Sequence, residues 1–242
     1  MISAFESDIG RIRGENQDFC YSFSLKNALF AIVADGMGGA NGGSVASKIA
    51  VEAVKKTIEK DYEASMSKGA LVDMLITSVR TANIEVLEYA AKHDSLEGMG
   101  TTLVLAAVRS DKAVILNIGD SRAYFVFDNE LRQVTKDQSY VQHLVDKGEI
   151  SAEEAKNHPK KNVIMQAVGT GDAICPDIYE IDYNGETILL CSDGLYNKVG
   201  ADDIIKTVND ESLSPKDRVK ELIHMANDAG GEDNISAVLI CK

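Results

Sequence analysis

The sequence lacks the residue patterns of several large classes of protein. Its four cysteines lie far apart and form no Cys-x-x-Cys pair, so neither a zinc knuckle nor a dithiol redox site is indicated. We expect the cysteines to be buried free thiols in a reducing compartment. No apolar run approaches the ~18 residues of a membrane helix, and no basic segment followed by an apolar core opens the chain. A soluble, cytoplasmic protein is therefore expected.

Positive charge is also scarce. The chain has 25 Lys and Arg residues against 38 Asp and Glu residues, a net charge of −13. A surface of this sign repels nucleic acids and anionic membranes, so neither is expected as a partner. Hydrophobic residues make up 45% of the chain, which is ordinary for a globular protein with a full core. We expect residues 1–242 to form a single domain and to act as a monomer.

Motifs of other enzymes that act on phosphate or bind zinc are absent. The chain contains no Gly-Lys-Ser/Thr triplet, no complete Gly-x-Gly-x-x-Gly and no His-Glu-x-x-His. A cysteine phosphatase needs an arginine six residues after its cysteine, but Lys26 and Asn197 stand at that distance from Cys20 and Cys191. These absences argue against a P-loop enzyme, a zinc protease of that motif and a cysteine phosphatase.

What the sequence contains instead is acidic residues at the ends of apolar strands. Residues 29–34 predict a buried strand that ends at Asp35 and opens into the glycine-rich residues 36–43. A hairpin turn at Asp35-Gly36 is the alternative, although a helical pattern rather than a returning strand follows. Carboxylates packed close together repel, so a repeated pattern indicates a site for metal ions. The same pattern recurs at Asp18, Asp120, Asp193 and Asp233.

The order of apolar periodicities predicts the fold class. Helical spacing predicts two long amphipathic helices over residues 44–60 and 69–92. Strands are expected on both sides of this pair, with residues 101–108, 112–118 and 121–127 forming an antiparallel meander, and two more helices are expected before the last strand. This order predicts an α+β fold, a four-layer α/β/β/α sandwich of two antiparallel sheets packed face to face with helices outside each. The charged, partly helical residues 135–172 interrupt the strands and predict a lid beside a site.

Six short motifs carry a more specific signal. They follow one another along almost the whole chain: Arg13-x-x-Asn16-Gln17-Asp18, Asp35-Gly36-Met37-Gly38-Gly39, Gly98-x-Gly100-Thr101-Thr102, Gly119-Asp120-Ser121-Arg122, Ser192-Asp193-Gly194-Leu195 and Asp233-Asn234. In this set the chain resembles the protein phosphatase 2C family, the PPM-type metal-dependent serine/threonine phosphatases, in its compact bacterial form.

The resemblance implies an activity and a site. A water bridged by two Mn²⁺ or Mg²⁺ ions would attack the phosphoryl group of phosphoserine or phosphothreonine proteins, among them a cognate kinase or its targets. Oxygen ligands without a His or Cys set agree with these metals rather than zinc. Arg13 would clamp the phosphoryl oxygens, and Asn234 would orient Asp233. Residues 135–172 would be the flap of this family, which touches protein substrates. The resemblance implies that Asp35 bridges both ions. Asp18 and the Gly36 carbonyl would be ligands on one side, and Asp193 and Asp233 on the other. Asp120 would be a ligand at a third, weaker metal position, and a purely structural role in a turn is an equally favoured alternative for it.

One position departs from the family pattern. Most relatives have a histidine after Gly39, thought to protonate the leaving oxygen, whereas this chain has Ala40. Ser44 also stands where an acidic residue is common. The alternative function is therefore a catalytically weak phosphoprotein-binding or regulatory module. The intact set of acidic residues weighs against this alternative.

Overall fold

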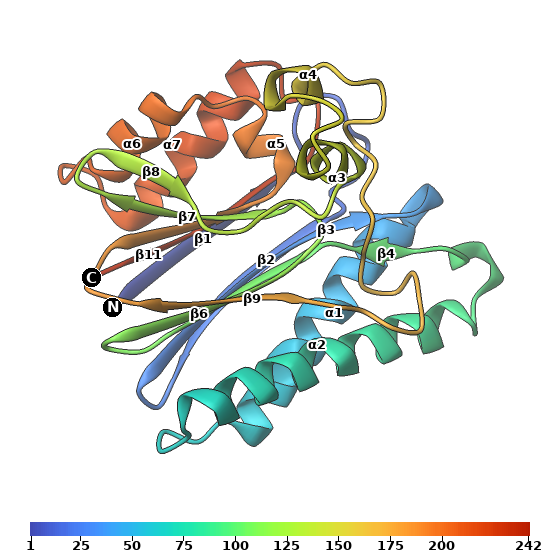
Figure 1. Cartoon of the computed structure of the whole chain (residues 1–242), viewed down its shortest axis with the longest axis horizontal. Helices are drawn as coiled ribbons and strands as arrows, with labels where there is room; N and C mark the ends of the chain where they lie inside the picture. The colour runs from blue at the N-terminus through green and yellow to red at the C-terminus, as the bar shows by residue number, and fades with distance from the viewer.

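The computed structural model describes the backbone of residues 1–242 and every side chain except those of residues 40 and 41. Two antiparallel sheets pack face to face, and a layer of helices covers the outer face of each sheet (Figure 1). The predicted four-layer α/β/β/α sandwich is confirmed. Within the described residues, no helix has the length and apolar character needed to cross a membrane.

The first sheet has the strand order β1-β11-β10-β7-β8. Its strands span Ile2–Asp8 (β1), Ile235–Cys241 (β11), Thr187–Cys191 (β10), Arg122–Phe127 (β7) and Glu130–Gln133 (β8). The second sheet has the order β2-β3-β5-β6-β9, and the short β4 pairs with β3. Its strands span Asp18–Leu25 (β2), Ala28–Met37 (β3), Gly100–Thr101 (β4), Leu103–Val108 (β5), Lys112–Ile118 (β6) and Asp177–Asp182 (β9).

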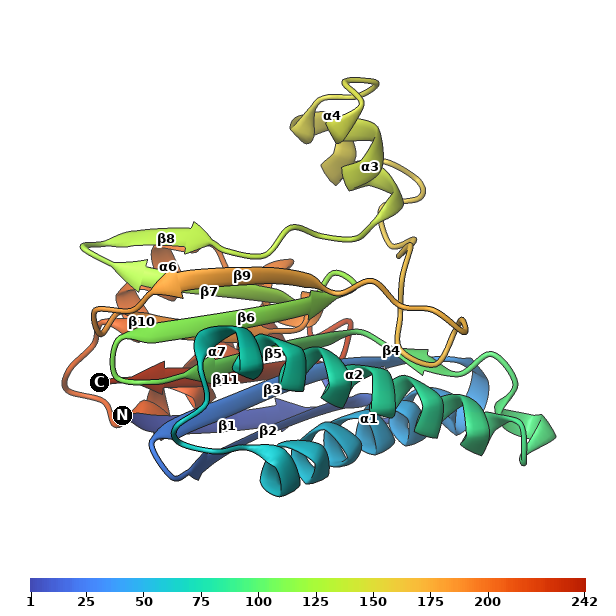
Figure 2. The ribbon, with the colours of Figure 1, turned by 60° about the horizontal axis from the view of Figure 1, so that its bottom comes forward.

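Helices from two parts of the chain form the outer layers. The pair α1 (Gly39–Asp61) and α2 (Lys68–Ala90) packs on the second sheet, and a 3₁₀ helix, η1 (Asp94–Leu96), follows. On the first sheet lie α5 (Asp193–Tyr196), α6 (Ala201–Val208) and α7 (Pro215–Asp228). The two remaining helices, α3 (Tyr140–Asp146) and α4 (Ala152–Lys156), stand apart from both layers at one end of the sandwich (Figure 2). They occupy the stretch predicted as a flap.

Strand β3 shows why the sequence has continuous apolar runs. Successive side chains of a strand point to opposite faces of the sheet. Phe30 and Ile32 pack against the helices α1 and α2, while Leu29, Ala31 and Val33 pack between the two sheets. A central strand covered on both faces needs apolar residues at every position.

Several predicted boundaries are wrong for identifiable reasons. Strand β3 does not end at Asp35 but continues to Met37, because its last two residues pair with β4; the alternative of a hairpin at Asp35-Gly36 is excluded. Helix α1 begins at Gly39 rather than at residue 44. The predicted three-strand meander is also wrong, because β5 and β6 pair in the second sheet while β7 pairs with β10 and β8 in the first.

The C-terminal half holds two further differences. Three helices rather than two precede the last strand, because Asp193 begins the short helix α5 instead of ending a strand. Among the cysteines, Cys20, Cys191 and Cys241 are buried as expected, but Cys175 is exposed because it lies in the irregular segment before β9.

Candidate active site

Seven segments of the chain meet at a cavity of about 320 Å³ at one end of the sandwich. The acidic residues that the sequence singled out come together here, with Asp18 pairing beside Asp35 in the β2–β3 register. Asp18 is only 6% exposed and lies under the cavity wall. The other predicted site residues line the cavity itself: Arg13, Asp35, Gly36, Asp120, Asp193 and Asp233.

Hydrogen bonds hold the backbone of Asp35 rigidly. Its N–H donates to the hydroxyl of Thr102 at 2.9 Å, and its carbonyl accepts from the Thr102 N–H at 2.8 Å and the Thr101 hydroxyl at 2.9 Å. The Thr102 hydroxyl is also 2.7 Å from that of Ser121, which follows Asp120. The Gly-Thr-Thr motif therefore orients Asp35 and ties it to the β6–β7 turn.

Two glycines allow the site segments to approach one another. A Cβ atom on Gly36 would lie 2.1 Å from the Gly43 carbonyl oxygen, and one on Gly194 would lie 2.0 Å from the Asn234 carbonyl oxygen. Real Cβ atoms do not approach backbone oxygens so closely, so a side chain at either position would push the segments apart. The motifs Asp-Gly and Ser-Asp-Gly thus bring the carboxylates together.

Asp18 is held by a buried pair of serines. The Ser192 hydroxyl donates to Asp18 Oδ2 at 2.7 Å and accepts from the Ser236 N–H at 2.9 Å. The other carboxylate oxygen, Oδ1, is buried and has no hydrogen-bond partner. The role of Ser192 was not predicted, although its place before Asp193 in the motif was a signal.

Asp193 and Asp120 line the same cavity as Asp35. The amide of Asn197 donates to Asp193 Oδ2 at 3.2 Å, whereas Asp193 Oδ1 is buried without a partner. The Tyr196 hydroxyl donates to the carbonyl of Asp120 at 3.1 Å. Two adjacent residues at the end of helix α5, Tyr196 and Asn197, therefore hold Asp120 and Asp193 in place.

Arg13 reaches the cavity from the loop between β1 and β2. Its Nη2 lies 2.8 Å from Asp233 Oδ2, and both side chains are partly exposed. The side chain of Asn234 bonds this loop: it accepts from the Gln17 N–H at 2.8 Å and donates to the carbonyls of Ile9 and Glu15 at 2.9 Å. Its link to Asp233 is through the backbone N–H, which donates to Asp233 Oδ1 at 2.9 Å.

The carboxylates of the site disfavour their own ionisation. Burial is the main cause, and it raises the pKa of Asp18 to about 7, that of Asp120 to about 7 and that of Asp193 to about 6. Burial and then the neighbouring carboxylates also raise the pKa of Asp35 well above its usual range. Arg13 is the only cation that lines the cavity among the described residues. An additional positive charge would therefore be strongly favoured here.

The residues fit a hard divalent cation in chemistry, but they are not arranged as a finished ligand shell. Asp18 and Asp193 each have a buried oxygen without a partner, and such oxygens on raised-pKa carboxylates suit Mg²⁺ or Mn²⁺. Among the described side chains, however, no three or more acidic, His or Cys residues converge closely enough to hold a metal. Arg13 occupies one oxygen of Asp233. Binding would require this pair to open.

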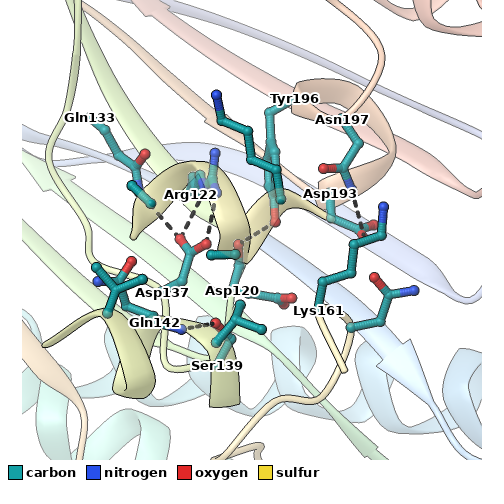
Figure 3. Close-up of a pocket in the computed structure, with 16 residues that line it drawn as sticks. Asp120, Arg122, Gln133, Asp137, Ser139, Gln142, Lys161, Asp193, Tyr196 and Asn197 are labelled. Atoms are coloured by element: carbon teal, nitrogen blue, oxygen red, sulfur yellow. Dashed lines mark hydrogen bonds and ion pairs between the residues drawn. The ribbon is translucent and has the colours of Figure 1, made fainter. Parts of the chain in front are cut away.

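The flap forms the outer rim of the site. Asn162 and Ile164 line the cavity, and a second cavity of about 390 Å³ lies between α3, α4 and α5. At the base of the flap, Arg122 donates to both oxygens of Asp137, at 2.9 and 2.7 Å, and its guanidinium lies 3.7 Å from the Tyr196 ring centroid (Figure 3). This half-buried contact was not predicted, although Arg122 ends the Gly-Asp-Ser-Arg motif.

No described residue that lines the cavity is a histidine. The side chain of Ala40 lies outside the described residues, so its surroundings are known only from sequence. Nearby, the Ser44 hydroxyl lies 2.6 Å from Glu15 Oε1. The chain therefore offers no imidazole donor from its described cavity wall.

Comparison with known proteins agrees with this geometry. The model of the protein phosphatase 2C family matches residues 13–239. A serine/threonine phosphatase, stp, of Listeria welshimeri is 41% identical over 245 residues, which cover 99% of this chain and 95% of that protein. The crystal structure of the serine/threonine phosphatase Stp1 from Staphylococcus aureus has a TM-score of 0.92 at 33% identity and covers 99% of this chain and 94% of that one.

A further solved structure bears on the metal. The catalytic domain of the serine threonine protein phosphatase PstP, in complex with two manganese ions, is 33% identical with a TM-score of 0.83 and covers 98% of this chain and 96% of that one. The family match and these relatives confirm the predictions of fold, enzyme class and family. The chain belongs to the protein phosphatase 2C family.

Proposed function

We propose that this protein removes phosphate from phosphoserine and phosphothreonine residues of proteins, using two divalent cations, Mn²⁺ or Mg²⁺, bound by its acidic cluster. The observation that carries the proposal is the set of buried carboxylates with raised pKa around one cavity, two of them with a partnerless oxygen. A cluster of this kind is costly in a folded protein unless cations neutralise it.

Each acidic residue has a proposed role. Asp35, at the centre of the cluster, would bridge the two cations, with Asp18 and the Gly36 carbonyl on one side and Asp193 and Asp233 on the other. Asp120 would hold a third, weaker cation. When bound, such ions neutralise developing charge on the phosphoryl group and lower the pKa of water from ~15.7 to ~7.

Arg13 would bind the phosphoryl oxygens. A guanidinium presents paired N–H donors that match phosphate oxygens, and the neighbouring carboxylates, Asp233 first, raise its pKa further. In the structure Arg13 bonds Asp233. Cations on Asp233 would release Arg13 toward the substrate, so metal and phosphate binding would assist each other.

The test is turnover of a phosphothreonine peptide and of p-nitrophenyl phosphate by the purified protein. Activity should vanish in chelator and return with Mn²⁺ or Mg²⁺, while alkylation of the exposed Cys175 should change little. Metal-dependent binding of phosphopeptide without turnover of either substrate would favour the alternative of a binding module. Full activity in chelator would contradict the metal proposal.

Broader expectations complete the proposal. Residues 1–242 are taken as one phosphatase domain, with residues 135–172 as its flap. Its substrates are proposed to include a cognate serine/threonine kinase or the targets of that kinase. The protein is expected to act as a monomer in the cytoplasm, and size-exclusion chromatography with light scattering would check the oligomeric state.

A further inference from the structure

The site cavity continues into two neighbouring cavities under the flap. These have volumes of about 390 and 490 Å³. Asp193 and Asn162 line both of them and also the site cavity of about 320 Å³, which is called the metal cavity below because the proposed metal ligands line it. The three hollows therefore form one groove between the flap and α5. A peptide whose phosphorylated residue enters the metal cavity has to lay its flanking residues along this groove or across its rim.

The lining of the groove away from the acidic cluster is rich in cations. Lys156, Lys161 and Lys198 line the larger cavity, in a protein with a net charge of −13. Lys198 is held by Glu232 at 2.7 Å, and Lys156 by Glu153 at 2.7 Å. The cations of the groove are thus mostly neutralised within the protein.

Lys161 is the exception. Its ammonium group makes no hydrogen bond or ion pair with any residue that the structure describes. It lines both flap cavities, and Figure 3 shows its side chain extending from the flap loop toward Asp193 and Asn197. The neighbouring Lys160 points elsewhere, since its ammonium lies 5.1 Å from the Tyr140 ring centroid.

We propose that Lys161 forms a subsite for an anionic group of the substrate, a carboxylate or a second phosphate, that flanks the phosphorylated residue. This inference rests on the proposed phosphatase function. Three carboxylates line the larger cavity with Lys161. Glu232, whose pKa is lowered first by Lys198 and also by Lys161, is already paired with Lys198. Asp193 and Asp233 are proposed metal ligands, so bound cations would neutralise their charge and leave the ammonium group of Lys161 available to the substrate. The enzyme would then prefer acidic or multiply phosphorylated segments over neutral ones.

The test compares phosphothreonine peptides of otherwise uncharged sequence. One Asp, one phosphoserine or one Ala is placed at each position within about three residues of the phosphothreonine, because an extended chain advances ~3.3–3.6 Å per residue. At saturating Mn²⁺, wild type should show a kcat/KM about 1.5- to 5-fold higher for a peptide with an anionic residue at one or more of these positions, because an exposed ion pair is worth about 0.2–1 kcal/mol. The preference should shrink at high salt.

Variants assign that preference to one residue. Lys161→Ala should abolish it and Lys161→Glu should reverse it, while p-nitrophenyl phosphate, which has no flanking group, should be hydrolysed as by wild type. Lys147→Ala is the matched control, since Lys147 lies on the same flap, is exposed and lines none of the three cavities. It should keep the full preference.

The outcomes separate the proposals. Preference for Asp and phosphoserine alike would identify a general anion subsite, and preference for phosphoserine alone would identify the second phosphate as its ligand. Equal rates for all wild-type peptides, or an unchanged preference in Lys161→Ala, would overturn the subsite. Absence of metal-dependent turnover on p-nitrophenyl phosphate would instead overturn the proposed function itself.

Discussion

Replacing Asp18 by Asn is expected to stabilise the metal-free protein and to weaken its response to metal. Asp18 is 6% exposed, and burial, as the main cause, raises its pKa from 3.8 to about 7. Each pKa unit corresponds to about 1.4 kcal/mol, so an ionised Asp18 lowers the free energy of unfolding by about 4 kcal/mol above pH 7. Asn removes this charge at nearly constant volume.

The gain in the free energy of unfolding should be smaller than the roughly 4 kcal/mol that the charge of Asp18 costs. The amide oxygen of Asn can still accept from Ser192, but its NH₂ group replaces an oxygen that has no partner. A buried donor without a partner costs about 1–3 kcal/mol. The net stabilisation at pH 8 is therefore about 1–3 kcal/mol, which is roughly 3–10 °C in Tm for a chain of this size.

The pH dependence gives the decisive readout. Below pH 3.8 Asp18 is protonated in both the folded and the unfolded state, so it has no effect on stability. Between pH 3.8 and about 7 only the unfolded state ionises, so the wild type loses stability as the pH rises. The Tm difference between Asp18→Asn and wild type should therefore be larger at pH 8 than at pH 5.

Thermal unfolding followed by circular dichroism in chelator, at both pH values, measures this difference. Mn²⁺ should raise the Tm of wild type more than that of the variant, because bound ligand stabilises the folded state by mass action. Asp172→Asn is the control, since Asp172 is exposed. A variant less stable than wild type at pH 8, or an equal difference at both pH values, would refute the reasoning.

Three further predictions concern the site. Asp35→Asn and Asp193→Asn should each remove most activity at limiting Mn²⁺, whereas Asp120→Asn should regain activity as Mn²⁺ is increased; metal titrations of the three variants would show the contrast. Arg13→Ala should raise KM for p-nitrophenyl phosphate about tenfold or more, because a charged hydrogen bond is worth ~1.5–3 kcal/mol, and steady-state kinetics measures this. Gly36→Ala should lower Tm and activity together, because its Cβ would lie 2.1 Å from the Gly43 carbonyl oxygen; equal Tm values would contradict it.

The acidic cluster could be predicted because each member carries a local signal. Asp35, Asp120 and Asp193 each stand beside glycine or a small polar residue at the end of an apolar strand, and the ends of strands from both sheets meet at the cavity. Asp18 pairs with Asp35 in adjacent strands. The sequence pattern therefore predicts the carboxylates without knowledge of the three-dimensional contacts.

Contacts between distant residues could not be predicted in this way. Ser192 and Asp18 are 174 positions apart, and no periodicity links them. Strand β7 is as apolar as β6, so local pattern does not reveal that the chain crosses to the other sheet between them. Helix α1 includes Gly42 and Gly43, although glycine has poor helix propensity, because a Cβ at these positions would press on Met99 and on the backbone of Gly36.

The absence of histidine at position 40 leads to the last prediction. A positioned general acid is worth ~10²–10⁴ in rate, but only where the leaving group needs a proton. A serine alkoxide needs one, whereas p-nitrophenolate hardly does, and no described residue lining the cavity is a histidine. Ala40→His should therefore raise kcat on a phosphoserine peptide clearly more than on p-nitrophenyl phosphate, and should add a titration to the pH–rate profile. Both substrates are to be measured at saturating Mn²⁺. An equal change on the two would mean that protonation of the leaving group does not limit the rate, and would leave the metal site unaffected.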